Sequence, residues 1–130
     1  MLARSGTLIL EEIKTDNEIE RRKNIAKVKF SSMAKILKSK RLKLATKLRI
    51  VKCYIYSIFT YGCEAWTLSK VLEAKIEAFE MWCLRELGNV MWKDIVRNES
   101  VLTKLKTKRQ LLSDIQKRSI LAMVREKTIS

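Results

Sequence analysis

The chain has no proline and only three glycines among its 130 residues, and this shortage limits the folds open to it. Hairpins between β-strands depend on tight turns whose backbone angles glycine and proline supply. A chain that lacks them favours helices joined by short connections. Hydrophobic residues make up 47% of the sequence, which is enough for one core in a domain of this length. We therefore expect an all-α fold, a small bundle of about four to five helices.

Apolar residues recur at intervals of three and four in the first half of the chain, the spacing of one helix face. Asp16 or Asn17 would cap a first helix, with the apolar face Ile19, Ala26, Phe30, Met33 and Leu37. Ser39 and Lys40 look like a short break before a second helix, with the face Leu44, Leu48, Val51, Ile55 and Ile58. Gly62 weakens or ends this second helix. The two helices are expected to form a basic antiparallel hairpin.

The ends of the chain and its second half carry weaker or shorter patterns. Thr7 to Ile13 could form a short strand or a loop. Residues 53–61 are rich in strand-forming residues, but the helical spacing that runs through them favours a helix. Ser69 would cap a third helix with the buried face Leu72, Ile76, Phe79, Cys83 and Leu87. Gly88 and Asn89 would end it, since both tolerate a left-handed backbone. Asn98 would cap a short helix with Val101, Leu102 and Leu105, and a last helix would span about 108–126 with Leu111, Leu112, Ile115, Ala122 and Met123.

Positive charge is concentrated in one quarter of the chain. Lysine and arginine number 28 against 14 acidic residues, a net charge of +14. Thirteen of the basic residues lie between Arg21 and Lys52, where no acidic residue occurs. Like charges at this spacing repel one another within a helix, and a bound polyanion would offset that repulsion. We predict phosphate contacts from Lys35, Lys38, Lys40, Arg41, Lys43, Lys47, Arg49 and Lys52. The alternative is a solvated helix face with no partner.

The residues that most enzymes and metal sites need are absent or scattered. Histidine does not occur, which removes the commonest general base and metal ligand. Cys53, Cys63 and Cys83 fit neither a disulfide framework nor a zinc site. No carboxylates are paired as a two-metal site requires, and Asp94 beside Trp92 is better interpreted as a helix cap. We expect no catalysis, no metal and no cofactor.

The cysteines, the longest uncharged run and the aromatic residues each allow an expectation about where the protein is located or how it packs. Three reduced cysteines suit an intracellular protein, nuclear or cytoplasmic. The longest run without charge, Cys53 to Cys63, is far shorter than the roughly 20 residues of a membrane span. Aromatic side chains crowd the middle of the chain, and at helical spacing with leucine and isoleucine they indicate core more than a base-stacking surface.

Residues 48–68, LRIVKCYIYSIFTYGCEAWTL, contain the element Tyr61-Gly62-x-Glu64-x-Trp66. This run resembles the segment after the polymerase core in LINE-type non-LTR retrotransposon endonuclease/reverse transcriptase polyproteins. Residues 72–85 and 16–30 resemble neighbouring stretches of the same family in the same order, so the likeness covers about residues 16–126. By this resemblance residues 16–87 would be a thumb-like helical region and 88–130 a C-terminal helical extension. Residues 1–15, whose pattern is weak, are expected to form a weakly structured N-terminal segment.

The resemblance implies a fragment of an RNA-directed DNA polymerase that binds template–primer without polymerising. The metal-binding aspartates of the family's palm have no matching positions here, and the endonuclease is absent. Trp92, Lys93, Asp94 and Asn98 fit the family's later motif, but Ile95 replaces its histidine, and the Gly-His of its last helix is missing. The expected partner is RNA, an RNA–DNA hybrid or duplex DNA, bound through phosphates without sequence preference. The alternatives are a helical protein–protein module that self-associates through an orphaned apolar face, and a decayed product without activity.

Overall fold

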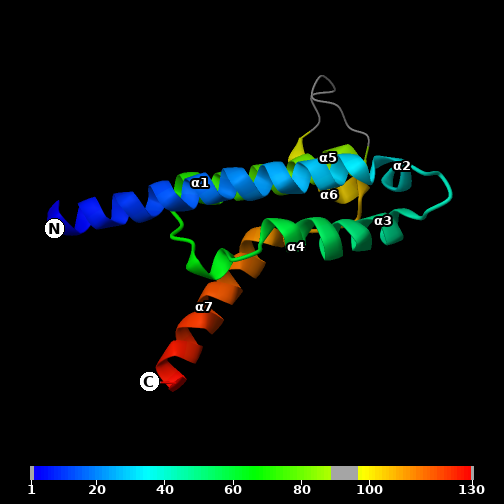
Figure 1. Cartoon of the computed structure of the whole chain (residues 1–130). Coiled ribbons are helices and arrows are strands. Elements are labelled where there is room, and N and C mark those ends of the chain that lie inside the picture. Colours follow the sequence, from blue (N-terminus) through cyan, green and yellow to red (C-terminus); the bar gives the residue numbers. More distant parts are fainter. Residues whose placement is uncertain (1, 89–96, 130) are drawn as a thin grey trace.

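The computed structural model describes residues 2–88 and 97–129, with side chains over 6–88 and 97–125, and every regular element in these ranges is helical (Figure 1). The long helix α1 spans Leu2–Ser32, and one further turn, α2, spans Ala34–Leu37. The chain reverses through residues 38–43 and returns antiparallel to α1 as α3 (Leu44–Ile50), η1 (Val51–Ile55) and α4 (Tyr56–Phe59). The predicted all-α class is confirmed.

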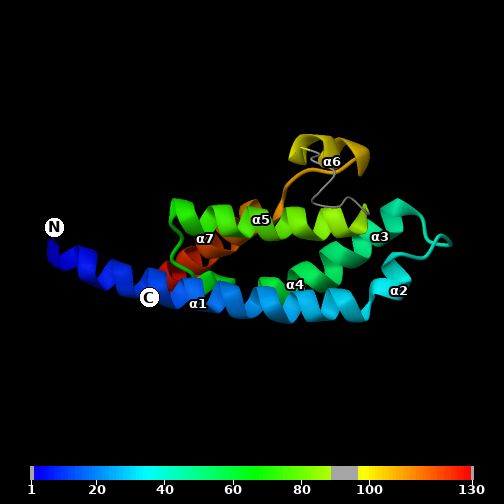
Figure 2. The same ribbon diagram turned by 90° about the horizontal axis from the view of Figure 1, so that it is seen from above.

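The second half of the chain completes the bundle. After the short turn η2 (Cys63–Ala65), helix α5 (Lys70–Leu87) lies alongside α1, as Figure 2 shows. Helix α6 (Asn98–Lys104) packs on α5, and α7 (Leu111–Ile129) contacts α5 and η2 before its C-terminal half leaves the bundle. Among the described helices none combines the length and the apolar character that crossing a bilayer requires.

The N-terminal segment differs from its prediction. Thr7 to Ile13 form neither strand nor loop, and Asp16 and Asn17 are not caps, because α1 runs through all of them without a break. Contacts with distant residues hold the helix at this point. Thr15 is buried and its Oγ1 accepts a hydrogen bond from the Thr67 N–H at 2.9 Å, while the Asp16 carboxylate pairs with Lys75 of α5. Side chains that would favour a helix start in isolation therefore serve here in tertiary contacts.

Two helix ends follow the sequence prediction. Ser69 has extended backbone angles, and its Oγ accepts a hydrogen bond from the Leu72 N–H at 3.3 Å, which caps α5. Gly62 has φ +77°, in the left-handed region that favours glycine, and α4 ends three residues before it at Phe59. The helical prediction across residues 53–59 is confirmed as well.

Other helix ends differ from their predictions. Gly88 does end α5, but with φ −84°, so no left-handed residue is used there, and Asn89 lies outside the described residues. Asn98 is the first residue of α6 and not its cap, because its side-chain oxygen accepts a hydrogen bond from Arg85 at 2.8 Å. The last helix begins at Leu111, three residues later than predicted.

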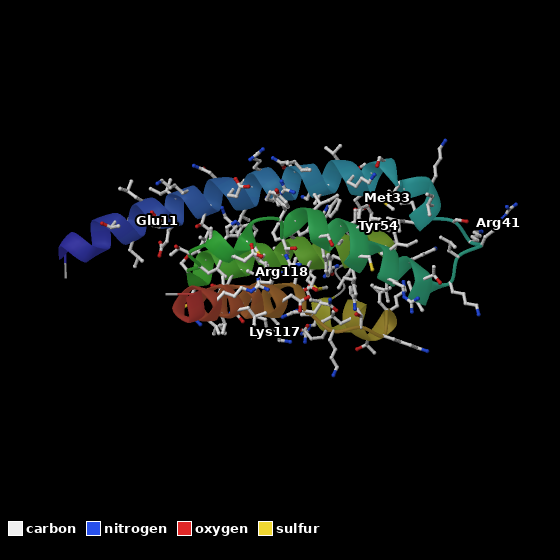
Figure 3. The ribbon with its side chains drawn as sticks, turned by 60° about the horizontal axis from the view of Figure 1, so that its bottom comes forward. Glu11, Met33, Arg41, Tyr54, Lys117 and Arg118 are labelled. Carbon is white, nitrogen blue, oxygen red and sulfur yellow. The ribbon has the colours of Figure 1, made fainter. Side chains whose placement is uncertain are left out.

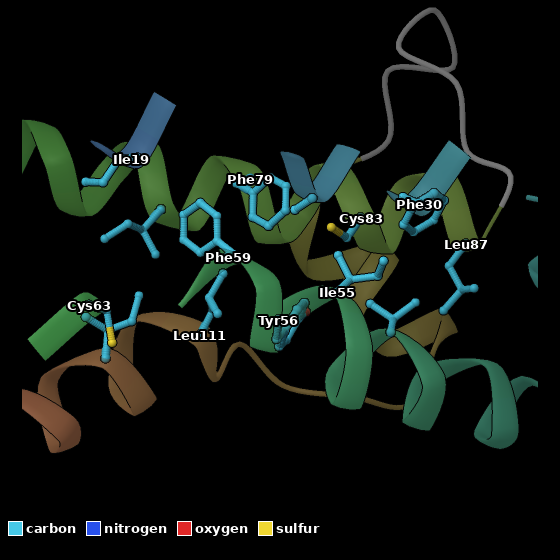
Figure 4. Packing of buried hydrophobic residues seen from close by; sticks show 14 of the residues in the cluster. Ile19, Phe30, Ile55, Tyr56, Phe59, Cys63, Phe79, Cys83, Leu87 and Leu111 are labelled. Atoms are coloured by element: carbon cyan, nitrogen blue, oxygen red, sulfur yellow. The ribbon is translucent and has the colours of Figure 1, made fainter. Parts of the chain in front are cut away.

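The core lies between α1, the returning segment, α5 and the start of α7 (Figure 4). Phe59 of α4 stacks on Phe79 of α5 with ring centroids 4.4 Å apart, and Trp66 meets Phe59 edge-on at 5.6 Å. The predicted α5 face is buried in full, and the core also takes Leu111 and Ile115 from α7. The prediction that most aromatic residues of the middle of the chain belong to the core is confirmed for these three and for Tyr56, and Trp82 packs partly buried against the core, whereas Tyr54 and Tyr61 are exposed.

Candidate nucleic-acid interface

The eight predicted phosphate-contacting residues surround the place where the chain reverses. Lys35 lies in α2, Lys38 follows its last residue, and Lys40 and Arg41 lie in the connection to α3. The others lie along the returning segment, Lys43, Lys47 and Arg49 at α3 and Lys52 in η1. Figure 3 places Arg41 at the tip of this connection, away from the packed helices. One end of the bundle therefore carries all eight residues.

Seven of the eight have no internal partner. Six are exposed and Lys47 is half-buried, and within the described residues none of the seven forms an ion pair or a side-chain hydrogen bond. We call this set the basic turn: Lys35, Lys38, Lys40, Arg41, Lys43, Lys47 and Arg49. Uncompensated cations this close together repel one another, and an anionic ligand would relieve that repulsion.

Lys52 is placed differently from the other seven. It is half-buried, and its Nζ donates a hydrogen bond to Thr107 Oγ1 at 2.9 Å. Thr107 belongs to the connection between α6 and α7, so this bond fastens that connection to η1. Lys52 thus has a structural role that its position in the sequence does not indicate.

Packing also occupies the basic residues nearer the start of the charged segment. Arg21 and Lys23 pair with Glu18 and Glu20, one turn earlier on α1. Arg22 donates from Nε to the Ile58 carbonyl at 2.9 Å. Lys27 places its ammonium 4.6 Å from the centre of the Trp82 ring, a cation–π contact. Lys29 is exposed and has no side-chain partner among the described residues, so the uncompensated charge of the segment lies at Lys29 and around the chain reversal.

The structure places near Lys52 two lysines that the sequence does not single out. Leu44 and Leu48 of α3 pack against the small core formed with α6, which brings the α6–α7 connection beside the returning segment. Lys106 and Lys108 flank Thr107 in that connection, and both are exposed. They are more than 50 residues from Lys52 in the chain, so no local pattern could have placed them near it.

Glu80 is the one carboxylate that the core encloses completely among the described residues. Its Oε2 accepts hydrogen bonds from the Tyr56 hydroxyl at 3.1 Å and from the N–H groups of Gln110 and Leu111 at 3.0 and 3.2 Å. Burial raises the pKa of Glu80 above its ordinary value, and the N–H groups of Gln110 and Leu111 oppose this.

A buried carboxylate with a raised pKa is a frequent mark of an active site. Glu80 does not fit that role, because its accepting oxygen is committed to the start of α7 and its side chain has no exposed surface. Within the described residues, no three histidine, cysteine or acidic side chains are grouped as metal ligands. The carboxylate of Asp94 and its neighbours Trp92 and Ile95 lie outside those residues.

Comparison of the chain with models of known protein families, with curated proteins and with solved structures finds no match in any of the three.

Proposed function

We propose that this chain binds nucleic acid through phosphate contacts made by the basic turn. The observation that carries the proposal is the grouping of seven cations without internal partners around the chain reversal, while Arg21, Arg22, Lys23 and Lys27 on α1 each have an internal partner. Lysine-rich surfaces neutralise phosphates without reading base edges. Binding would therefore have little dependence on sequence and would weaken steeply with salt.

We further propose that the chain derives from the thumb and following region of a LINE-type reverse transcriptase. The ordered resemblance of residues 16–126 supports this origin, and a helical element that grips template–primer through its backbone suits the basic turn. Polymerisation is not part of the proposal, because the residues that would hold catalytic metal ions have no counterparts in the sequence.

Fluorescence anisotropy with labelled oligonucleotides tests the binding. Each phosphate that the protein neutralises steepens the fall of log K with log salt by about 0.7 to 0.9. If about five residues of the basic turn bind phosphates, a fourfold rise in salt should weaken binding on the order of 100-fold. No binding of RNA or DNA in dilute buffer would refute the proposal.

Charge reversal identifies the surface. The triple variant Lys43→Glu, Lys47→Glu and Arg49→Glu should abolish binding while its circular dichroism spectrum stays helical, since these side chains have no internal partners. The matched control reverses three exposed basic residues elsewhere, Lys14, Lys70 and Arg97. The control changes net charge by the same amount, so equal losses in both variants would show that total charge, and not the basic turn, drives binding.

Self-association is a second candidate function, and the exposed apolar side chains at two projecting helix ends favour it. Large apolar residues in these places, 51–60% exposed, are Leu8, Ile9, Leu10 and Ile13 on α1, and Ile120, Leu121, Met123 and Val124 on α7. Figure 1 shows both helix ends leaving the bundle opposite the connection between α2 and α3. Exposed apolar side chains grouped at a helix end are a common feature of interaction sites.

The charges beside these two apolar segments are of opposite sign, apart from Lys14 next to Ile13. Glu11 and Glu12 lie among the apolar residues of α1, whereas Lys117 and Arg125 flank those of α7, and Figure 3 shows Glu11 and Lys117 on separate helices. In a two-fold dimer, each α1 end would contact the partner's α7 end.

Sedimentation equilibrium tests this second candidate. Ile13→Asp should give a monomer, and Val71→Asp, at another exposed apolar position, should leave the dimer intact. A wild-type chain that is monomeric throughout would exclude this candidate. An oligomer that persists in salt without affinity for RNA would favour it over the first.

A further inference from the structure

Two tyrosines stand apart from the aromatic core. Tyr54 in η1 is 58% exposed and Tyr61, just after α4, is 72% exposed, whereas Tyr56 between them is buried. Tyr54 and Tyr61 lie seven residues apart on the returning segment, the first in η1 and the second just beyond α4, where it lies beside Arg22 of α1. That segment is the one that leaves the basic turn. Helix α1 contacts η1, and in the view of Figure 3 the label of Tyr54 lies close to that of Met33, the residue after α1, with Arg41 at the tip of the connection.

The π-helical turn η1 explains the exposure of Tyr54. Val51 and Ile55 at its two ends are both fully buried. A π-turn holds more residues than an α-turn and is wider, so the residues between its buried ends are turned further from the core. Such turns are frequent at functional sites. Here the wider turn places a large aromatic ring in solvent on the segment that also carries Lys47 and Arg49 of the basic turn.

Tyr61 is held in position by Arg22. The guanidinium of Arg22 lies 5.2 Å from the centre of the Tyr61 ring, and Arg22 is itself fixed by its hydrogen bonds to the Ile58 carbonyl. An arginine over an aromatic ring gains cation–π stabilisation and orders that ring. The ring therefore remains in place although most of the residue is exposed to solvent.

We propose that Tyr54 and Tyr61 form a stacking surface for unpaired bases, and that the ligand of the basic turn is single-stranded nucleic acid. This inference rests on the proposed function and specifies its substrate class. Bases in a duplex are already stacked on one another, so exposed tyrosines add affinity only where bases are free. Cations beside aromatic side chains are the usual combination in proteins that bind single strands.

The experiment compares an oligouridylate with an RNA duplex of the same nucleotide number, by anisotropy at one salt concentration. The oligouridylate should bind more tightly. Tyr54→Ala should weaken its binding on the order of tenfold, because stacking on one side chain contributes about that factor. Tyr54→Phe keeps the ring and should retain the affinity. Val71→Ala is the control, since Val71 is 68% exposed and lies on α5.

The duplex and the salt dependence separate the two proposals. Tyr54→Ala should leave duplex affinity unchanged, and the salt slope of single-strand binding should also stay the same, because stacking releases no counterions. Irradiation of an oligonucleotide containing 5-iodouridine should crosslink to Tyr54 or Tyr61. Equal affinity for both probes, with no effect of Tyr54→Ala, would overturn the stacking surface and leave phosphate binding standing. Failure of both probes to bind would overturn the proposed function as well.

Discussion

Replacing Glu80 tests the reasoning about the core most directly. One carboxylate oxygen of this α5 residue accepts hydrogen bonds from Tyr56, Gln110 and Leu111, and so links α4, α5 and the start of α7. Gln110 and Leu111 stand where α7 begins, so Glu80 supplies from another helix the acceptor that an N-cap residue normally provides.

The cost of Glu80→Ala can be worked out from these hydrogen bonds. The three donors would lose their acceptor inside the protein, and an unsatisfied buried donor costs about 1–3 kcal/mol. The shortened side chain also leaves a cavity. Part of this loss is offset, because the variant no longer buries Oε1, an oxygen that has no hydrogen-bond partner among the described atoms. We expect the free energy of unfolding to fall by about 3 kcal/mol.

Urea unfolding followed by circular dichroism gives this quantity. Tyr56→Phe is the matched control, because it removes one of the three donors and keeps the ring, and it should cost about 1 kcal/mol. A loss below about 1 kcal/mol for Glu80→Ala would show that the carboxylate does not hold α7 in place.

The dependence on pH gives an independent check. Burial raises the pKa of Glu80 above its ordinary value of 4.5 in the folded protein. The folded protein therefore binds a proton on the Glu80 carboxyl group more tightly than the unfolded chain does. The contribution of Glu80 to stability is greatest below about pH 4.5, and it declines as pH rises through the folded-state pKa. Glu80→Gln does not titrate. The stability advantage of the wild type over Glu80→Gln should therefore shrink across this window, and an advantage that grows with pH would contradict the assignment.

Three further outcomes follow from local features. Lys106 has φ +54°, a backbone angle that glycine adopts without strain. Lys106→Gly should therefore raise the free energy of unfolding, measured by urea titration, by about 1 kcal/mol. Lys106→Ala, measured in the same way, should give no gain. Ser69→Ala should lower it by about 1 kcal/mol through loss of the α5 cap, and an unchanged urea midpoint would count against that cap. Iodoacetamide should label Cys53 in the folded protein but spare Cys63 and Cys83, whose thiol pKa values burial raises, and mass spectrometry that finds either of the latter modified first would contradict the packing.

The helix faces were predictable because they depend on neighbours within one turn. The positions from Leu72 to Leu87 recur at helical spacing, and all of those predicted for α5 are buried. Ser69 and Gly62 act through their own backbone angles and the next few residues, so their roles were visible in the sequence too. The concentration of positive charge in one segment is likewise a property of composition along the chain.

What tertiary structure alone decided is which polar side chains have partners. Asp16 is a good helix cap in isolation, yet Lys75, 59 residues away, draws it into a tertiary ion pair in the middle of α1. Packing likewise removes Lys52 from the predicted surface and brings Lys106 and Lys108 near Lys52. Glu80 caps α7 across 30 residues of chain. Hydrogen bonds and ion pairs act only over a few ångströms, so these outcomes depend on which distant segments meet, and the local pattern of a sequence does not contain that information.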